Sequence, residues 1–301
     1  GPRGANYKWT EVMMRDASMF LDAIALHYYT RVGDQVIIEH LPDGNERYLR
    51  DSRKSRKSAT DFDEAQWFGI MKAAIFTDEL VSKHISIMDR YDPDKKVALI
   101  VDEWGTWFDN EPGTNPGFLY QQNTLRDAVS AGTSLNIFNN HADRIHMTNI
   151  AQTVNVLQAM VLTEGEKMIL TPTYHVYDMY KVHQDAMLLD FAVLSDDYEC
   201  GTEKLRQMNA SISKDAKGNI NATLVNINPN QMAEVTFHIG DFGMISHVYG
   251  TVLTSEAMNT MNTFEHPDQI HPKEFTDFII EGNTIYIKMP SKSVVLLTIK
   301  R

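Results

Sequence analysis

Residues 97–107 read VALIVDEWGTW, so five apolar residues are followed at once by two carboxylates and then by two tryptophans. A strand with one solvated face alternates apolar and polar residues, whereas a parallel strand buried between helices is apolar on both faces. This run therefore predicts a buried parallel strand, with Asp102 and Glu103 at its carboxyl end.

Two further apolar runs lie on either side of this one along the chain, at residues 22–29 and, more weakly, at residues 144–150. Between the runs, apolar residues recur every three to four positions, which is the period of an amphipathic helix. Helices are expected at residues 63–88, 118–138 and 173–182, the last with Pro172 at its start. Alternating strands and helices predict an α/β fold with a parallel sheet over residues 1–185.

After about residue 186 the pattern changes to short segments of alternating polarity. Turn residues separate some of them, notably Lys217-Gly218-Asn219 and Glu281-Gly282-Asn283, the second in hairpin position. This spacing predicts an antiparallel β-sandwich of about eight strands over residues 186–301. The strand candidates include residues 221–228, 233–239, 247–253, 284–289 and 293–299.

Composition argues against several kinds of partner. The 301 residues carry 28 basic and 40 acidic side chains and a net charge of −12, so no nucleic acid partner is expected. No apolar run approaches about 18 residues, so neither a membrane span nor a membrane partner is expected. Cys200 stands alone and the histidines lack ligand spacing, which predicts no metal site. Without a glycine-rich phosphate loop, no cofactor is expected either.

Polar groups end all three apolar runs, where the loops of an α/β barrel converge on its active site. Strand alternation places Glu103 on the face of Val101 and Asp102 on the other, so only one carboxylate is expected to face the barrel mouth. A carboxylate beside indole rings suits sugar chemistry, because aromatic faces stack on sugars while the acid attacks the anomeric carbon. A helix N-cap or a surface ion pair is the alternative for this Asp-Glu pair.

The first run ends in His27-Tyr28-Tyr29, and the third leads into Asn149 and Gln152. Taken singly, His27 is more typical of a structural histidine than of a catalytic one. The amides of Asn149 and Gln152 fit hydrogen bonds to sugar hydroxyls and loop capping equally well. The three strand ends together favour a site more than any one of them does.

Five motifs stand in order along the first half: LHYY at 26–29, VDEWGTW at 101–107, HADR at 141–144, NIAQTVNV at 149–156 and TPTYHV at 171–176. Together they make the sequence resemble the α-L-arabinofuranosidases of glycoside hydrolase family 51. The resemblance implies a retaining mechanism in which Glu103, at the end of barrel strand seven, is the nucleophile. It implies that His27 and Tyr29 line the sugar pocket from strand six and that Trp107 packs beside the nucleophile. It also implies that Gln152 contacts substrate after strand eight.

A complete (β/α)8 barrel has eight βα units in about 250 residues, whereas residues 1–185 supply three strand candidates. The expected fold is therefore a partial (β/α)8 TIM barrel, strands six to eight, followed by the sandwich. By the resemblance, the acid/base glutamate after strand four and an N-terminal strand of the sandwich would lie outside this sequence. Asn45-Glu46 reproduces the Asn-Glu pair of the acid/base motif, but it lies in a turn-rich segment, and coincidence is the better interpretation.

The expected function is that of a parent protein, which releases terminal α-L-arabinofuranosyl residues from arabinose-containing oligo- or polysaccharides such as arabinan. This chain alone is expected to be nearly inactive. Two alternatives stay open: a non-catalytic carbohydrate-binding or assembly fragment, and another retaining glycosidase of the same barrel clan. Open parallel edges predict a homo-oligomer or a complementing N-terminal segment. Residues 1–4 lack the apolar stretch of a signal peptide, and a periplasmic or secreted parent protein is nevertheless suspected.

Overall fold

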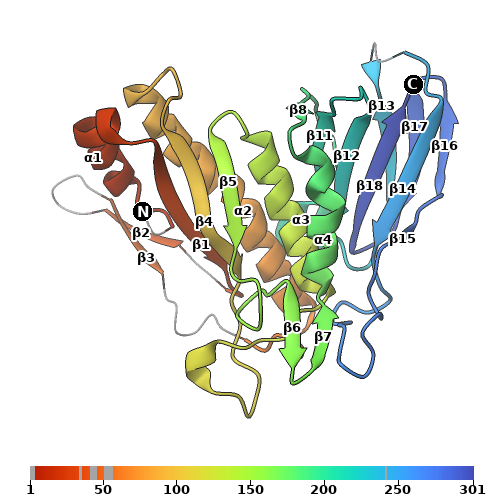
Figure 1. Ribbon diagram of the computed structural model, residues 1–301, viewed down its shortest axis with the longest axis horizontal. Helices are drawn as coiled ribbons and strands as arrows, with labels where there is room; N and C mark the ends of the chain where they lie inside the picture. The colour runs from red at the N-terminus through yellow and green to blue at the C-terminus, as the bar shows by residue number, and fades with distance from the viewer. Residues whose placement is uncertain (1–3, 34–35, 41–45, 51–56, 241–242) are drawn as a thin grey trace.

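In this computed structural model, a parallel sheet covered by helices lies beside two antiparallel sheets (Figure 1). The structure describes the chain apart from residues 1–3, 34–35, 41–45, 51–56 and 241–242, and describes residues 36–40 and 46–50 by their backbone only.

Three strands form the parallel sheet in the order β1-β4-β5, and a helix follows each of them. The strands are β1 (Ala23–Thr30), β4 (Ala98–Thr106) and β5 (Ile145–Ile150). The helices are α2 (Glu64–Tyr91), α3 (Leu125–Asn140) and α4 (Pro172–Tyr180). The predicted alternation of strands and helices is confirmed. Because the strands are parallel, their carboxyl ends share one edge of the sheet.

Shorter elements surround this sheet. They are α1 (Tyr7–Ala17), η1 (Ser18–Phe20), the hairpin of β2 (Val36–His40) and β3 (Glu46–Arg50), η2 (Pro116–Phe118), the hairpin of β6 (Val161–Glu164) and β7 (Lys167–Leu170), and η3 (Lys181–His183). α1 packs on α2, where the buried His84 Nδ1 lies 2.8 Å from Thr10 Oγ1.

The helix predicted over residues 118–138 begins later, at Leu125. Leu119 has a φ of +52°, and this left-handed conformation cannot continue an α-helix. Thr124 and Asp127 form a capping box, in which each side chain accepts a hydrogen bond from backbone at the start of α3. The prediction erred because the apolar residues before Thr124 extended the helical period into a loop.

The second half of the chain holds two antiparallel sheets, as predicted for a β-sandwich. One has the order β15-β14-β18-β12-β11-β8 and contains β8 (Met187–Leu188), β11 (Met208–Lys214), β12 (Ile220–Asn226), β14 (His247–Leu253), β15 (Lys273–Glu274) and β18 (Ser293–Lys300). The other has the order β13-β17-β16 and contains β13 (Ala233–His238), β16 (Phe278–Glu281) and β17 (Thr284–Met289). A separate ribbon joins β9 (Asp197–Cys200) to β10 (Glu203–Arg206). The predicted hairpin at Gly282 connects β16 to β17, with a φ of +61° that suits glycine.

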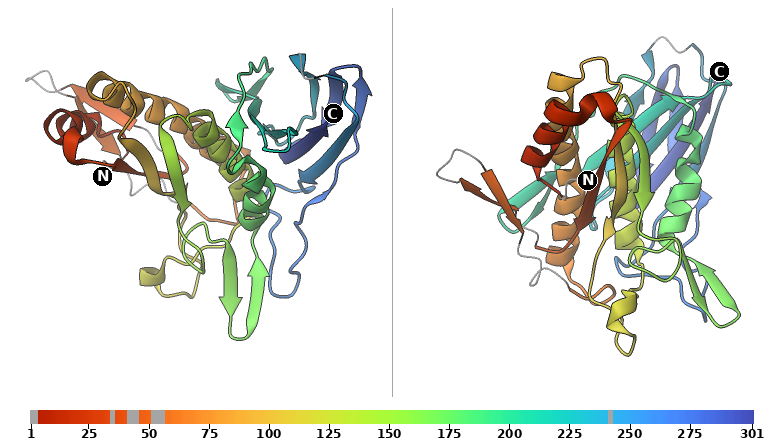
Figure 2. Two further views of the ribbon diagram at one scale, coloured as in Figure 1. Left: turned by 45° about the horizontal axis from the view of Figure 1, so that its top comes forward. Right: turned by 60° about the vertical axis from the view of Figure 1, so that its left-hand side comes forward.

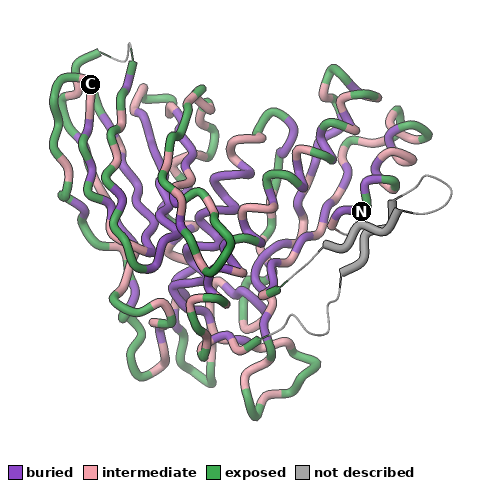
Figure 3. The backbone as a smooth tube through the Cα atoms, turned by 180° about the vertical axis from the view of Figure 1, so that it is seen from behind, coloured by how far each residue is buried: buried purple, intermediate pink, exposed green. Residues whose placement is uncertain are grey.

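α3 lies between the parallel sheet and the six-stranded sheet, and every residue from Leu125 to Phe138 is buried (Figures 2 and 3). The helix approaches the six-stranded sheet closely, since a Cβ added to Gly132 would lie 3.1 Å from Val225 Cγ2 and Val294 Cγ2. These valines belong to the same apolar core as the parallel sheet. The core that supports β4 therefore continues into the sandwich.

Candidate active site

The carboxyl ends of β1, β4 and β5 lie at the lower edge of the parallel sheet in Figure 1, where the β6–β7 hairpin also extends. In the register of β1 and β4, His27 pairs with Glu103 and Tyr29 pairs with Gly105. Residues that the sequence predicted at the ends of two separate strands are therefore neighbours.

Glu103 contacts two side chains of β1 through its Oε2 atom. Tyr29 Oη donates a hydrogen bond to this oxygen over 3.0 Å, and His27 Nδ1 lies 3.3 Å from it. The Glu103 side chain is 46% exposed. Its carboxylate is thus oriented by the Tyr29 donor, lies beside the imidazole and remains accessible to a ligand, which is what a nucleophile requires.

Asp102 approaches the same imidazole, with its Oδ1 atom 3.0 Å from His27 Nε2. The expectation that only one of the two carboxylates faces the strand end is therefore wrong. The cause is a β-bulge in β4: Ala25 pairs with Ile100, but the next pair in register joins His27 to Glu103. β4 thus holds one more residue than β1 over this stretch, and the extra residue interrupts the alternation of side chains.

Trp107 lies beside the tyrosine that binds the carboxylate. Its ring is 5.1 Å from that of Tyr29, centroid to centroid, at 72°, and the guanidinium carbon of Arg31 lies 4.4 Å from the indole centroid. Burial and the hydrogen bond to Glu103 both raise the pKa of Tyr29, so its hydroxyl stays protonated as a donor. No sequence pattern singled out Arg31, because a basic residue after a strand is typical of a solvent-exposed position.

Gln152 lies just beyond β5 and is exposed, and the peptide bond that precedes it is cis. Ala151 N donates a hydrogen bond to Trp104 O, which ties the start of this loop to β4. Among the described residues, no hydrogen bond joins the Gln152 side chain to Glu103 or its partners. The structure therefore places Gln152 at the predicted edge without bringing it into polar contact with the carboxylate.

A buried polar network supports the end of β4 from behind. Thr106 Oγ1 donates to Asp127 Oδ1, and Thr106 N donates to Gln158 Oε1 over 2.8 Å. Gln158 Nε2 in turn donates to Thr173 Oγ1 over 3.0 Å. Gly105 has a φ of +137°, and a Cβ there would lie 3.2 Å from Gln158 Oε1. The network joins β4 to the starts of α3 and α4, and the Thr124–Asp127 spacing was the one sequence signal for it.

Of the two alternatives for the Asp-Glu pair, the described residues do not show the N-cap at the next helix, because the N-cap of α3 is Thr124. Both carboxylates lie within ion-pairing distance of His27, so the ion-pair alternative stays open. Glu46, the other carboxylate considered from the sequence, has a side chain that lies outside the described residues.

The described residues hold no group of three or more histidine, cysteine, aspartate or glutamate side chains that could bind a metal ion. No helix in the same residues is long and apolar enough to cross a membrane.

Residues 102–293 match the family described as "Alpha-L-arabinofuranosidase C-terminal domain". A curated relative from Bacteroides ovatus, named an intracellular exo-α-L-arabinofuranosidase, is 39% identical over 301 residues, which are 100% of this chain and 55% of the relative. The crystal structure of a GH51 arabinofuranosidase from Xanthomonas axonopodis pv. citri is 42% identical with a TM-score of 0.91, over 100% of this chain and 57% of the other.

A more distant structure, of α-L-arabinofuranosidase from Thermotoga maritima in complex with arabinose, has a TM-score of 0.75 at 18% identity, over 98% of this chain and 56% of the other. At that identity the likeness concerns the fold alone. The chain spans about half the length of each of these relatives.

The suspicion of a periplasmic or secreted parent protein is wrong on this comparison, because the Bacteroides ovatus relative is named an intracellular enzyme. The residues themselves had offered no signal for either compartment.

Proposed function

Because the chain belongs to the α-L-arabinofuranosidases of glycoside hydrolase family 51, we propose that its parent protein releases terminal α-L-arabinofuranosyl residues from arabinose-containing polysaccharides with retention of configuration. The observation that carries the proposal is the contact of Glu103 with Tyr29 and His27 at the carboxyl edge of a parallel sheet. The substrate class is supported by the name of the Bacteroides ovatus relative, an exo-α-L-arabinofuranosidase.

Glu103 is the nucleophile of this reaction. In the first step its carboxylate forms a bond to the anomeric carbon while the bond to the leaving oxygen breaks, and a general acid protonates that oxygen. Tyr29 and His27 both approach Oε2, which leaves Oε1 for the attack. In the second step the same acid/base group deprotonates a water molecule, which attacks the anomeric carbon and releases the Glu103 carboxylate.

The other predicted residues bind the sugar. His27 and Tyr29 line the pocket on one side of Glu103, and Trp107 packs beside Tyr29. Gln152, exposed at the end of β5, contacts the substrate through its amide.

We assign residues 1–185 to strands six to eight of a (β/α)8 barrel, and residues 186–301 to the C-terminal sandwich domain. Three consecutive parallel βα units support the first assignment. The general acid/base then belongs to strand four, in a part of the parent protein outside this sequence. A chain without that group cannot protonate a poor leaving oxygen, so it is nearly inactive on natural glycosides.

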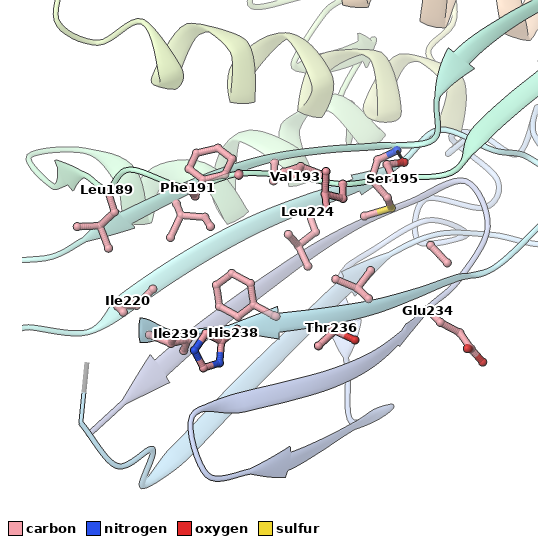
Figure 4. Close-up of a pocket in the computed structure, with 18 of the residues that line it drawn as sticks. Leu189, Phe191, Val193, Ser195, Ile220, Leu224, Glu234, Thr236, His238 and Ile239 are labelled. Atoms are coloured by element: carbon pink, nitrogen blue, oxygen red, sulfur yellow. Dashed lines mark hydrogen bonds between the residues drawn. The ribbon is translucent and has the colours of Figure 1, made fainter. Parts of the chain in front are cut away.

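A cavity of about 1010 Å³ opens in the sandwich (Figure 4), and none of its lining residues belongs to the candidate active site. Apolar side chains such as Leu189, Phe191 and Leu224 point into it. β13 is an edge strand, and β8 covers only Ser213 and Lys214 of β11. Unpaired strand edges around a slot that polar and apolar side chains line together suit an extended segment, so we assign the cavity to a complementing segment of the parent protein.

The nucleophile is tested in the full-length parent protein with an aryl α-L-arabinofuranoside. Glu103→Ala is expected to lower turnover by about three orders of magnitude or more. Glu79→Ala, which removes an exposed glutamate of α2 that pairs with Lys83, is the matched control and keeps full turnover. NMR of the first-formed sugar reports retention. Unchanged turnover in Glu103→Ala, or an inverted product, contradicts the proposal.

The complementing segment is tested by expressing this chain and the remaining part of the parent protein as two polypeptides. A one-to-one complex that gains activity on arabinan, which this chain alone lacks, is the expected result. A self-associating chain with an occupied cavity points to the homo-oligomer instead. Activity of the chain alone on arabinan contradicts the assignment of the acid/base to the missing part.

A further inference from the structure

We propose that Asp102 is a positioning residue for the nucleophile, which acts by holding His27 against Glu103. The proposal rests on the proposed function of Glu103 and adds to it a residue to which neither the resemblance nor the relatives assign a role. It follows from a chain of contacts, Asp102 to His27 to Glu103, that the bulge in β4 creates.

The contacts use both nitrogens of one ring. Asp102 Oδ1 lies 3.0 Å from His27 Nε2, and Glu103 Oε2 lies 3.3 Å from His27 Nδ1. Oδ1 is shielded from solvent and has no hydrogen-bond partner among the described residues, so its approach to His27 Nε2 is a contact at ion-pairing distance rather than an aligned hydrogen bond. Asp102 therefore has no partner in this part of the chain that would give it a purely structural function, such as a helix cap or an arginine.

At this pair of carboxylates β4 is irregular relative to both of its neighbours, and a second register shift with β5 lies between Leu99 and Ile100. β4 carries its extra residue relative to β5 as well as to β1, because Val101 pairs with Thr148 while the next pair joins Trp104 to Ile150. Regular alternation would turn Asp102 away from the face of Glu103. An irregularity shared with both neighbouring strands thus serves to bring a second carboxylate to the imidazole.

The position of Asp102 indicates what it contributes. It lies at one nitrogen of the ring while Glu103 lies at the other, so it limits movement of the ring away from Glu103. When Glu103 becomes an ester to the sugar, Asp102 still holds the ring, so His27 is in place for the second step.

Several titratable groups of the described residues lie near His27. On the side of β4 the facing groups are Asp102 and Glu103, and on β1 the nearest are the phenol of Tyr29 and the guanidinium of Arg31 beyond it. On the opposite face of β1, the neighbouring Tyr28 donates its hydroxyl hydrogen to Ala73 O of α2, so α2 presents a backbone carbonyl there. Among the described residues, Asp102 is the group that can fix the ring on its far side.

The test is a double-mutant cycle in the full-length parent protein with an aryl α-L-arabinofuranoside. Asp102→Asn keeps the volume of the side chain and removes its charge, and is expected to lower kcat by on the order of ten- to a hundredfold with KM within about twofold. In a His27→Gln background the same substitution has little further effect.

Asp78→Asn is the matched control, because Asp78 Oδ1 lies 2.7 Å from His141 Nε2 in an aspartate–histidine pair away from the site. This variant keeps the kcat of the wild type. If Asp102→Asn does not fold, Asp102→Ser serves in the same cycle. The inference is overturned if Asp102→Asn keeps a kcat within about twofold of wild type, or if the effects of the Asp102 and His27 substitutions simply add. In that case, loss of turnover in Glu103→Ala still upholds the proposed function. Full turnover in Glu103→Ala overturns both.

Discussion

The hydroxyl of Thr106 donates a hydrogen bond to the buried carboxylate of Asp127, and this contact joins the end of β4 to the first turn of α3. The second oxygen of the same carboxylate accepts a hydrogen bond from Thr124 N over 2.7 Å. Asp127 is fully buried, and burial raises the pKa of its carboxyl. Asp127 therefore holds the strand that carries Glu103 from behind, as one member of the buried polar network around Thr106.

Asp127→Ala is expected to lower the free energy of unfolding by about 3 kcal/mol, because it leaves the Thr106 hydroxyl and the Thr124 amide buried without an acceptor. Urea unfolding followed by circular dichroism measures the loss. Asp143→Ala removes an exposed aspartate that contacts Lys95, and is expected to change the stability by less than about 0.5 kcal/mol. Equal stability of the two variants contradicts the structural role of the Thr106–Asp127 contact.

Gly250 lies in β14 opposite Phe275, the residue that follows β15, and a Cβ there would lie 2.2 Å from Phe275 O. Gly250→Ala must push the two backbones apart, so we expect a loss of about 3 kcal/mol in the free energy of unfolding. Gly240→Ala is the control, because a Cβ at Gly240 meets no atom within 4 Å. Equal melting temperatures of the two variants would show that β15 can move away from Gly250 without loss of stability.

Much of the fold follows from residue periodicity. The apolar run at residues 97–103 becomes β4, and the expected strand at 293–299 becomes β18 with its ends shifted by a single residue or none. Both are central strands, so burial on two sides leaves a continuous apolar signal in the sequence. Periodicity could not fix the start of α3, because loop residues before Thr124 are apolar too and the helix itself is buried all round.

The candidate site could be predicted only in part. That Glu103 meets residues of another strand follows from the shared edge of a parallel sheet, and the register places His27 beside it. The bulge that also turns Asp102 toward His27 depends on the register with two neighbouring strands, which no local pattern records. The functions assigned to Trp107 and Gln152 stay predictions.

His183 gives the stability of the protein a dependence on pH. Its Nδ1 lies 2.7 Å from Ser213 Oγ and its Nε2 3.0 Å from Thr223 Oγ1, and burial lowers the pKa of the ring to about 4. The unfolded chain takes up a proton near pH 6.5 and the folded chain does so only near pH 4. Stability is therefore full above the unfolded value, and about 3 kcal/mol is lost as the pH falls through this window.

The buried His84 adds a loss of the same sign, because burial lowers the pKa of its ring to about 4 as well. His183→Gln is thus expected to remove about half of the combined dependence. Urea unfolding at pH 7 and at pH 4 measures it for the wild type and the variant. If the two lose the same free energy between these pH values, proton uptake at His183 is not linked to folding.

Tyr29→Phe isolates the hydrogen bond that the phenol donates to Glu103 Oε2. A hydrogen bond to a charged acceptor contributes about 1.5–3 kcal/mol, so kcat/KM of the full-length parent protein on an aryl α-L-arabinofuranoside should fall about ten- to a hundredfold. Tyr198→Phe is the control. Tyr198 lies away from the site, and its Oη donates to Glu64 Oε1 over the same distance, 3.0 Å.

Since burial raises the pKa of Tyr29, its phenol stays protonated, and the loss of kcat/KM in Tyr29→Phe should be equal at every pH below about 10. Equal activity of the two variants would mean that Glu103 is oriented without this donor, and the assignment of Oε1 as the attacking oxygen would lose its main support.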